Sequence, residues 1–296
     1  MRYKINHTTV YTYDRPVMLD SHVLRLRPRS DVTQKLDTFS LEIDPKPEKI
    51  VENVDLDGND VIQIWFPSQK ATASLNVQVS SEVETFRTNP FDFLLEKWAT
   101  TLPMDYPNSL LQQLRPYLSH SQEFPFSTDP VANELAQDIC LATDGNTVSF
   151  LSELNQRIHH HCQYGIRETG APQPPSITWK QQAGSCRDFA VLFMAVCQAV
   201  GLAARFVSGY QEGDPDIEDC QLHAWAEVYL PGAGWHGYDP TNEVAVSDRH
   251  IALVASPFSQ KTIPVKGSLK AEGYRARSEM NYHLTVQRLE NESPHP

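Results

Sequence analysis

The stretch Ala183-Gly184-Ser185-Cys186-Arg187-Asp188-Phe189-Ala190 is the most informative part of this chain. A loop rich in Gly, Ser and Gln ends here, and the apolar spacing that follows predicts a helix from about Cys186 to Val200, with Gly201 as its C-terminal cap. A thiol at a helix start faces the positive end of the helix dipole and unpaired backbone N–H groups, which favour the thiolate. We therefore interpret Cys186 as a nucleophile rather than a buried structural thiol.

A predicted β-hairpin follows the cysteine. A Pro-Gly-Ala-Gly turn joins Leu222-His223-Ala224-Trp225-Ala226-Glu227-Val228-Tyr229-Leu230 to Trp235-His236-Gly237-Tyr238-Asp239-Pro240-Thr241. Alternation places His223 and Trp225 on one face of the first strand, and the turn folds the second strand back so that Asp239 comes near His223. The sequence leaves the register open. Cys, His and Asp in this order supply a nucleophile, a base and an orienting carboxylate.

These three segments together resemble the core motif of the transglutaminase-like superfamily, which has Gly-x-Cys at a helix start, a His-Ala-Trp-x-Glu strand and an Asp-Pro-Thr. The resemblance covers residues 179–241, and residues 201–210 resemble the segment that leaves the nucleophile helix. Residues 3–13 and 24–29 resemble the β-rich N-terminal region of bacterial transglutaminase-like proteins. The resemblance implies an α+β fold, in which a β-sandwich-like domain precedes a papain-like transglutaminase core of helices packed on an antiparallel sheet.

The pattern of apolar residues divides the chain. Residues 1–87 alternate between apolar and polar side chains and are interrupted by turn residues, which predicts short strands in a small sandwich. Helices are predicted at 130–142 and 149–160, and a last strand at 280–289. In the proline-rich segment that follows residue 87 we expect short helices and burial of the large apolar side chains Phe91, Phe93, Leu94, Leu95 and Trp98. The predicted organisation is a β domain (1–87), a connecting segment (88–125), a catalytic core with the C-terminal strand (126–289) and a frayed tail (290–296).

The composition of the chain indicates which kinds of binding partner and which cellular compartment to expect. A net charge of −12 over 296 residues argues against nucleic acid and anionic membranes, which both require clustered Lys and Arg. The first ten residues lack the apolar core of a signal peptide, and no stretch has the ~20 apolar residues that span a bilayer. Five widely spaced cysteines fit a reducing compartment. We therefore expect a cytoplasmic protein; its oligomeric state is not indicated.

The motif order predicts a mechanism that requires no metal and no organic cofactor. The Cys186 thiolate, paired with a His223 imidazolium, would attack an amide or ester carbonyl while Asp239 orients the imidazole. The backbone N–H of Cys186 is the expected first donor to the oxyanion, and the second is left open among Trp179, Gln181 and Gln182. Trp225 would exclude water from the His–Asp pair, fill the core, or do both.

Other reactive-looking residues have simpler interpretations. Cys140, Cys162, Cys197 and Cys220 are expected to be structural thiols. In His159-His160-His161-Cys162 we expect a solvated helix end and not a metal site, because neighbouring helical residues point about 100° apart and cannot converge on one ion. The segment 55–60 is expected to be a hairpin turn rather than a calcium loop, and the acidic run 213–219 a solvated loop, with a gate over the cleft as the alternative.

Three functions remain open at this point. The first is a thiol hydrolase, a cysteine peptidase or amidase that cleaves an amide or isopeptide bond of a peptide or protein. The second is an acyltransferase that joins glutamine side chains to amines, and the third is a non-catalytic binding module. Hydrolysis is favoured, since the bacterial proteins that this chain resembles lack the β-barrel domains of the animal cross-linking enzymes. The presence of all three triad residues disfavours the binding module.

Overall fold

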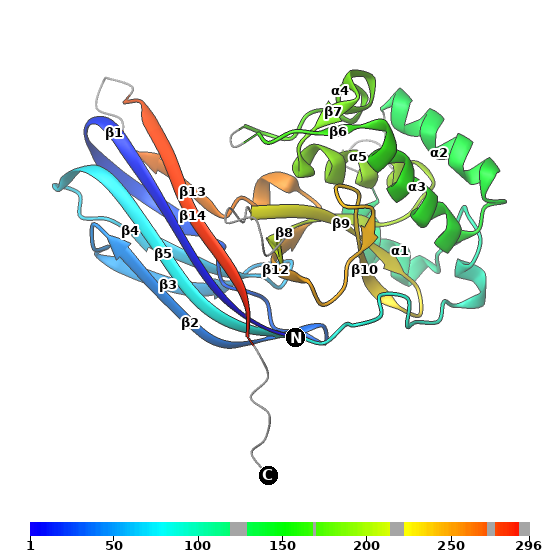
Figure 1. Cartoon of the computed structure of the whole chain (residues 1–296), viewed down its shortest axis with the longest axis horizontal. Helices are drawn as coiled ribbons and strands as arrows, with labels where there is room; N and C mark the ends of the chain where they lie inside the picture. The colour runs from blue at the N-terminus through cyan, green and yellow to red at the C-terminus, as the bar shows by residue number, and fades with distance from the viewer. Residues whose placement is uncertain (119–128, 168–169, 214–221, 271–275, 290–296) are drawn as a thin grey trace, which may run out of the picture.

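The computed structural model describes residues 1–118, 129–167, 170–213, 222–270 and 276–289, and its helices and strands form two packed units (Figure 1). The acidic run 214–219, Cys220 and the tail 290–296 lie outside the described residues. Among the described residues, no helix has the length and apolarity needed to cross a membrane.

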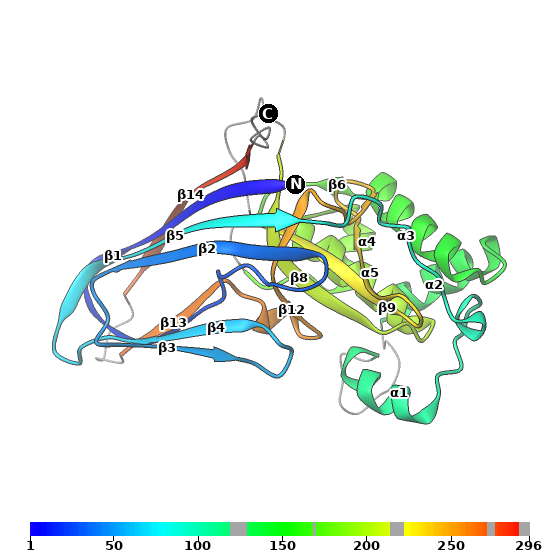
Figure 2. The same ribbon diagram turned by 90° about the horizontal axis from the view of Figure 1, so that it is seen from below.

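The first unit is a β-sandwich built around one long strand. The first half of β1 (Arg2–Leu24) pairs with β5 (Ala71–Thr85), and its second half pairs with β4 (Asp60–Trp65). β2 (Gln34–Asp44) and β3 (Lys49–Val54) complete the order β2-β5-β1-β4-β3. Since β1 passes from one layer to the other, the two layers face each other and bury the alternate side chains of its first half (Figure 2).

The C-terminal strands complete this sandwich. β14 (Ser278–Leu289) pairs antiparallel with β1 from Arg2 opposite Leu289 to Tyr13 opposite Ser278, and β13 (Val265–Leu269) pairs with the second half of β1. The last strand predicted at 280–289 is therefore present, but it lies in the N-terminal sheet and not in the sheet of the core (Figure 1). Alternation of polar and apolar residues predicts a strand but does not show which other strand it pairs with. This is why the last strand was predicted in the wrong unit.

The second unit is a five-stranded antiparallel sheet covered by helices. Its order is β11 (Val244–Ala245), β10 (Gly234–Asp239), β9 (Leu222–Leu230), β8 (Ala204–Gln211) and β12 (His250–Ser256). Helix α5 (Cys186–Ala199) packs on β8 and β9 and is itself covered by other helices, so it is buried almost throughout. The covering helices are α2 (Pro130–Ala142), α3 (Thr147–His161) and α4 (Pro175–Gln181). The predicted α+β fold, a strand-rich N-terminal domain followed by helices on an antiparallel sheet, is confirmed.

Short elements fill the connections. They are α1 (Asn108–Leu114), three 3₁₀ turns (Lys97–Ala99, Arg115–Tyr117 and Ser259–Lys261) and the strand pair β6 (Gln163–Tyr164) and β7 (Ala183–Gly184). The expected burial of the connecting segment is wrong for Phe91, Leu94 and Trp98, which are 50%, 87% and 37% exposed. This irregular stretch lies over one surface of the core, so only alternate side chains, Phe93 and Leu95, pack inward.

The two units share a buried boundary. Tyr210 on β8 and three residues of β12 belong to the same apolar cluster as the sandwich core. The outer edge of β12 is bound by two buried amide side chains: Asn59 spans the N–H and C=O of Ala255, and Gln34 those of Ala252, all at 2.7–3.0 Å. Because these amides satisfy an otherwise open strand edge, the sandwich holds the five-stranded sheet of the second unit in one position.

Candidate active site

One buried carboxylate holds the turn that carries Cys186. The Asp188 side chain accepts hydrogen bonds from the backbone N–H and the hydroxyl of Ser185, each at 2.8 Å. Its other oxygen accepts from Arg167 Nη2 at 2.5 Å and from the backbone N–H of Gln173 at 2.7 Å. These bonds fix the residue before Cys186, so the thiol begins α5 in a defined direction.

Glycine is required immediately before this turn. A Cβ atom on Gly184 would lie 2.9 Å from Cβ of Asp188 and 3.0 Å from the ring of Phe189, which is closer than packed carbon atoms approach. The sequence interpretation recognised the Gly-Ser-Cys stretch but missed Asp188. The signal was present, because Ser185-x-x-Asp188 before an apolar run is the pattern of a capped helix start.

The hairpin of β9 and β10 brings His223 to Asp239. Its register pairs Ala226 with Tyr238, and this leaves His223 and Asp239 on the same face of the sheet. His223 Nε2 donates to Asp239 Oδ2 at 2.8 Å, and the His223 side chain also hydrogen-bonds Cys186. Since Nε2 is bound to Asp239, Nδ1 is the nitrogen that remains for the thiol. The three predicted residues thus form one continuous chain of contacts.

The charges of this chain of contacts follow from the pKa values. Burial lowers the pKa of His223, but the Asp239 carboxylate and the hydrogen bonds to Asp239 and Cys186 outweigh burial and raise the pKa to about 10. Burial acts to raise the pKa of Asp239, yet the His223 charge and its hydrogen bond hold that pKa well below its usual range. At neutral pH a positive imidazolium therefore lies between Asp239 and Cys186.

Further donors surround the Asp239 carboxylate. Oδ2 accepts from Asn242 Nδ2 at 2.8 Å and from His250 Nε2 at 3.2 Å, and Oδ1 accepts from the backbone N–H of Thr241 at 3.0 Å. Burial lowers the pKa of His250 more strongly than Asp239 raises it, so His250 is a neutral donor. The sequence interpretation missed His250, because no local pattern connects this residue of β12 with the hairpin.

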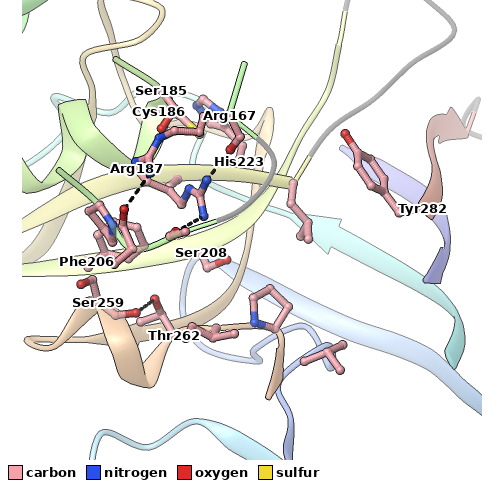
Figure 3. Close-up of a pocket in the computed structure, with 18 of the residues that line it drawn as sticks. Arg167, Ser185, Cys186, Arg187, Phe206, Ser208, His223, Ser259, Thr262 and Tyr282 are labelled. Atoms are coloured by element: carbon pink, nitrogen blue, oxygen red, sulfur yellow. Dashed lines mark hydrogen bonds between the residues drawn. The ribbon is translucent and has the colours of Figure 1, made fainter. Parts of the chain in front are cut away.

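Cys186 and His223 open onto a cavity of about 490 Å³ that is lined by residues of both units. Figure 3 shows Cys186, Arg187 and His223 on the side formed by the core and Tyr282 of β14 on the side formed by the sandwich. A thiol at a helix start, paired with a histidine at the wall of a cavity, has the parts needed for covalent attack on a bound carbonyl.

Comparisons with known proteins agree with this arrangement. Residues 3–84 match the bacterial transglutaminase-like N-terminal region, and residues 133–240 match the transglutaminase-like superfamily. Residues 133–240 belong to the transglutaminase-like superfamily. The crystal structure of a candidate cysteine protease from Cytophaga hutchinsonii aligns over 99% of this chain and 92% of its own with a TM-score of 0.73, which at 19% identity shows the shared fold.

Two sequence relatives extend the comparison. An uncharacterized protein of Mycobacterium tuberculosis is 29% identical over 280 residues, which is 90% of this chain and 87% of that protein. A protein-glutamine gamma-glutamyltransferase of Pseudomonas aeruginosa is 29% identical over 133 residues, which is 42% of this chain and 20% of that protein. The proteins similar to this chain thus include one named as a candidate cysteine protease and one named for acyl transfer.

The four residues predicted to assist the Cys–His–Asp set, Trp225, Trp179, Gln181 and Gln182, lie in different places in the core. Trp225 is 1% exposed and lies against the rings of both His223 and His250, with centroid separations of 6.3 and 5.2 Å. Trp179 stacks on His161 at a centroid separation of 3.8 Å, while Gln181 and Gln182 are exposed. None of these last three is among the residues that line the cavity with Cys186, and the second oxyanion donor stays unassigned.

Two groups of side chains in the described part of the chain bring three potential metal ligands within 4.8 Å of one another. One is the internally bonded set of His223, Asp239 and His250. The other is partly exposed and consists of His159, His160 and Glu243. The expectation that adjacent helical histidines cannot converge is wrong for this pair, since Nε2 of His159 and of His160 lie 3.8 and 3.5 Å from Glu243 Oε2. The long side chains and a glutamate from another segment offset the 100° difference in direction.

The other described cysteines are buried or half-buried, and they are not among the residues that line the cavity with Cys186. Cys162 and Cys197 are buried, and burial raises the pKa of the Cys162 thiol to about 11 and that of Cys197 well above its usual range. Cys140 is half-buried.

Glu227, on the same face of β9 as His223, is held by Arg205 at 2.6 Å. Glu227 is therefore engaged elsewhere and does not compete for His223.

The His223–Asp239 pair should make stability depend on pH. A histidine whose pKa rises from 6.5 to about 10 on folding stabilises the protein fully below pH 6.5, and this stabilisation is lost as the pH rises toward 10. The lowered pKa of Asp239 adds stability above its usual range that is lost on acidification. We expect the difference in unfolding free energy between the wild type and His223→Gln to decrease from pH 7 to pH 9.5, by at most about 1.4 kcal/mol per pH unit.

Urea unfolding of both proteins across this pH range measures that difference, and titrating groups that do not contact His223 cancel between them. A difference that stays constant or grows with pH would contradict a protonated His223 in the native state.

Proposed function

We propose that this protein is a cysteine hydrolase that cleaves an amide or isopeptide bond of a peptide or protein through a thioester on Cys186. The observation that carries the proposal is the continuous contact from Cys186 through His223 to Asp239 at the wall of a cavity. The charge order of carboxylate, imidazolium and sulfur is the one that prepares a thiol for attack at neutral pH.

In the first half of the reaction Cys186 Sγ attacks the carbonyl carbon of the substrate. The carbonyl π electrons move onto oxygen, where the backbone N–H of Cys186 at the helix start donates to the oxyanion. His223 Nδ1 then gives its proton to the leaving nitrogen, the C–N bond breaks, and an amine departs. The products of this half are a Cys186 thioester and a neutral His223 that is still bound to Asp239.

In the second half the thioester is hydrolysed. His223 removes a proton from a water molecule, whose oxygen attacks the thioester carbon, and collapse of the second oxyanion releases the acid and restores the thiolate. Asp239 stays a carboxylate throughout, because its role is to hold the tautomer and the charge of His223. Trp225 supports this role, since its indole excludes water from the far side of the ring.

The charge of the cavity supports water as the acceptor. Besides the Asp239-bound His223, the charged side chains among the described residues that line it are Arg187 and Arg167, which Asp188 binds. No carboxylate among these lining residues is available to bind a lysine ammonium. Water is present at about 55 M, so an amine at millimolar concentration competes only where a site binds it and excludes water. Acyl transfer to an amine is the alternative, favoured by the partial similarity to the Pseudomonas gamma-glutamyltransferase.

Product analysis separates the two acceptors. With a glutamine-containing peptide or a p-nitrophenyl ester as acyl donor, and a lysine analogue at millimolar concentration, we expect mainly free acid by mass spectrometry. Cys186→Ala is the matched control and should give neither product above background. A majority of amine adduct would overturn hydrolysis and establish a transglutaminase, and equal products from Cys186→Ala would exclude covalent thiol catalysis.

A further inference from the structure

The active-site cavity is closed on one side by the N-terminal sandwich. His7, Thr9 and Tyr11 of β1, together with Met280 and Tyr282 of β14, line the same cavity as Cys186. In Figure 3 Tyr282 projects from β14 across the cavity from Cys186 and His223. Because the sandwich is bound to the catalytic sheet through β12, this wall is part of the folded site and not a loose neighbour.

Large apolar side chains dominate the rest of the lining. Three of them are exposed to solvent at the cavity although they are apolar: Tyr164, Ile166 and Ile263, which are 44%, 62% and 41% exposed. They come from two separate segments, and the less exposed Phe206, Leu222 and Met280 belong to the same lining. Exposed apolar residues that gather at one hollow indicate a surface that is covered when a ligand binds.

Two polar side chains of the sandwich wall, His7 and Thr9, already have hydrogen-bond partners in the protein. Burial lowers the pKa of His7 to about 4, so the ring is neutral. Its Nδ1 lies 3.0 Å from the hydroxyl of Tyr210 and its Nε2 lies 3.1 Å from Thr9 Oγ1. The polar groups of His7 and Thr9 are therefore engaged within the protein, and the rings of Tyr11 and Tyr282 with the side chain of Met280 supply most of the apolar contact of this wall.

The arginines of the opposite wall are held by the protein itself. Arg167 binds Asp188 and donates to the carbonyl of Ala171 at 2.8 Å, and Arg187 donates to the carbonyl of Gly170 at 2.8 Å. They shape the rim near Cys186, and no carboxylate among the described lining residues is available to bind a cationic side chain.

We propose that the N-terminal sandwich acts as the specificity wall of the active site, and that the cavity takes a large apolar or aromatic side chain of the peptide next to the bond that Cys186 attacks. The cavity volume of about 490 Å³ lies within the range of roughly 300–1,000 Å³ of small-ligand pockets. The substrate class is thus a peptide or protein segment with an aromatic or large aliphatic residue at the cleavage site. This assignment rests on the proposed attack by Cys186.

Three iodoacetamides that differ only in the N-substituent test the wall independently of turnover. The substituents are 2-phenylethyl, 2-carboxyethyl and 2-aminoethyl, and glutathione gives the intrinsic reactivity of each reagent. We expect the phenylethyl reagent to alkylate Cys186 at least about tenfold faster than either charged reagent after this correction, since an apolar pocket discriminates by one to two orders of magnitude. Peptide mass spectrometry identifies the labelled cysteine.

Variants of the sandwich wall complete the test. Tyr282→Ala should remove most of the phenylethyl preference, Tyr282→Phe should keep it, and His283→Ala should leave it unchanged because the next residue of β14 points to the other face and is exposed. Circular dichroism verifies that each variant is folded. The preference for phenylethyl is the quantity compared, so a uniform change in reactivity does not affect the result.

The outcomes distinguish this inference from the proposed function. If Cys186 is labelled first by plain iodoacetamide but shows no preference for phenylethyl, the apolar specificity is wrong and the reactive thiol stands. A preference that Tyr282→Ala leaves intact would exclude the sandwich as its source. Labelling of Cys140, Cys162 or Cys197 ahead of Cys186 by every reagent would overturn the reactive thiol, and with it both proposals.

Discussion

Cys186→Ala is expected to abolish turnover, with a loss on the order of 10⁴-fold or more, while the protein stays folded. Removing the nucleophile of a covalent mechanism leaves only the residual rate that binding and oxyanion donors provide. The fold should survive because Cys186 is the first residue of α5, and the helix start is held by Ser185 and Asp188 rather than by the thiol. Turnover of the preferred substrate, far-UV circular dichroism and the melting temperature measure the two effects.

Cys197→Ala is the matched control on the same helix. Cys197 is fully buried in the core between α5 and its neighbours, so its loss should lower the melting temperature and leave turnover near that of the wild type. The opposite pattern, in which Cys186→Ala unfolds and Cys197→Ala inactivates, would reverse the roles of the two thiols.

The parts of the site that could be predicted from the sequence are those formed by residues close together along the chain. A helix start at Cys186 and a strand–turn–strand carrying His223 and Asp239 each leave a local signal, and the hairpin turn brings the last two together whatever the rest of the chain does. The same holds for the helix predicted at 130–142, which has the bounds of α2. Periodicity and capping act over a few residues, so they are visible without a structure.

The parts that could not be predicted depend on pairing between distant segments. His250 reaches Asp239 only because β12 lies beside β8 in the sheet, and Tyr282 reaches the cavity only because β14 pairs with β1. The local sequence of neither strand indicates which strand it pairs with, since pairing depends on which faces are buried in the whole sheet. The cavity wall that we assign to specificity was invisible in the sequence for this reason.

His250 differs from Cys186, His223 and Asp239 because it contacts the Asp239 carboxylate and not the groups that react. Its neutral ring donates from Nε2 to the carboxylate, and it packs edge-on against Trp225. A donor in this place restricts the direction of Asp239 without taking part in proton transfer. Its removal should therefore cost less than removal of the carboxylate itself.

Asp239→Asn is expected to lower kcat by roughly 10²- to 10⁴-fold, because a carboxylate that orients a catalytic histidine contributes in this range. Four donors point at this side chain: His223, His250 and Asn242 at one oxygen and the N–H of Thr241 at the other. An amide has only one oxygen, so in either orientation its NH₂ group meets at least one donor. The imidazolium form of His223 also loses its counter-ion, and the alkaline limit of activity should shift to lower pH.

A pH profile of kcat for the wild type, Asp239→Asn and His250→Gln tests this assignment. We expect the loss and the alkaline shift to be large in Asp239→Asn and small in His250→Gln, since only the first removes the charge that faces His223. A silent Asp239→Asn would require another acceptor for the histidine. Glu227 does not fill that role, because Arg205 binds its carboxylate at 2.6 Å, so a silent variant would contradict the triad as a whole.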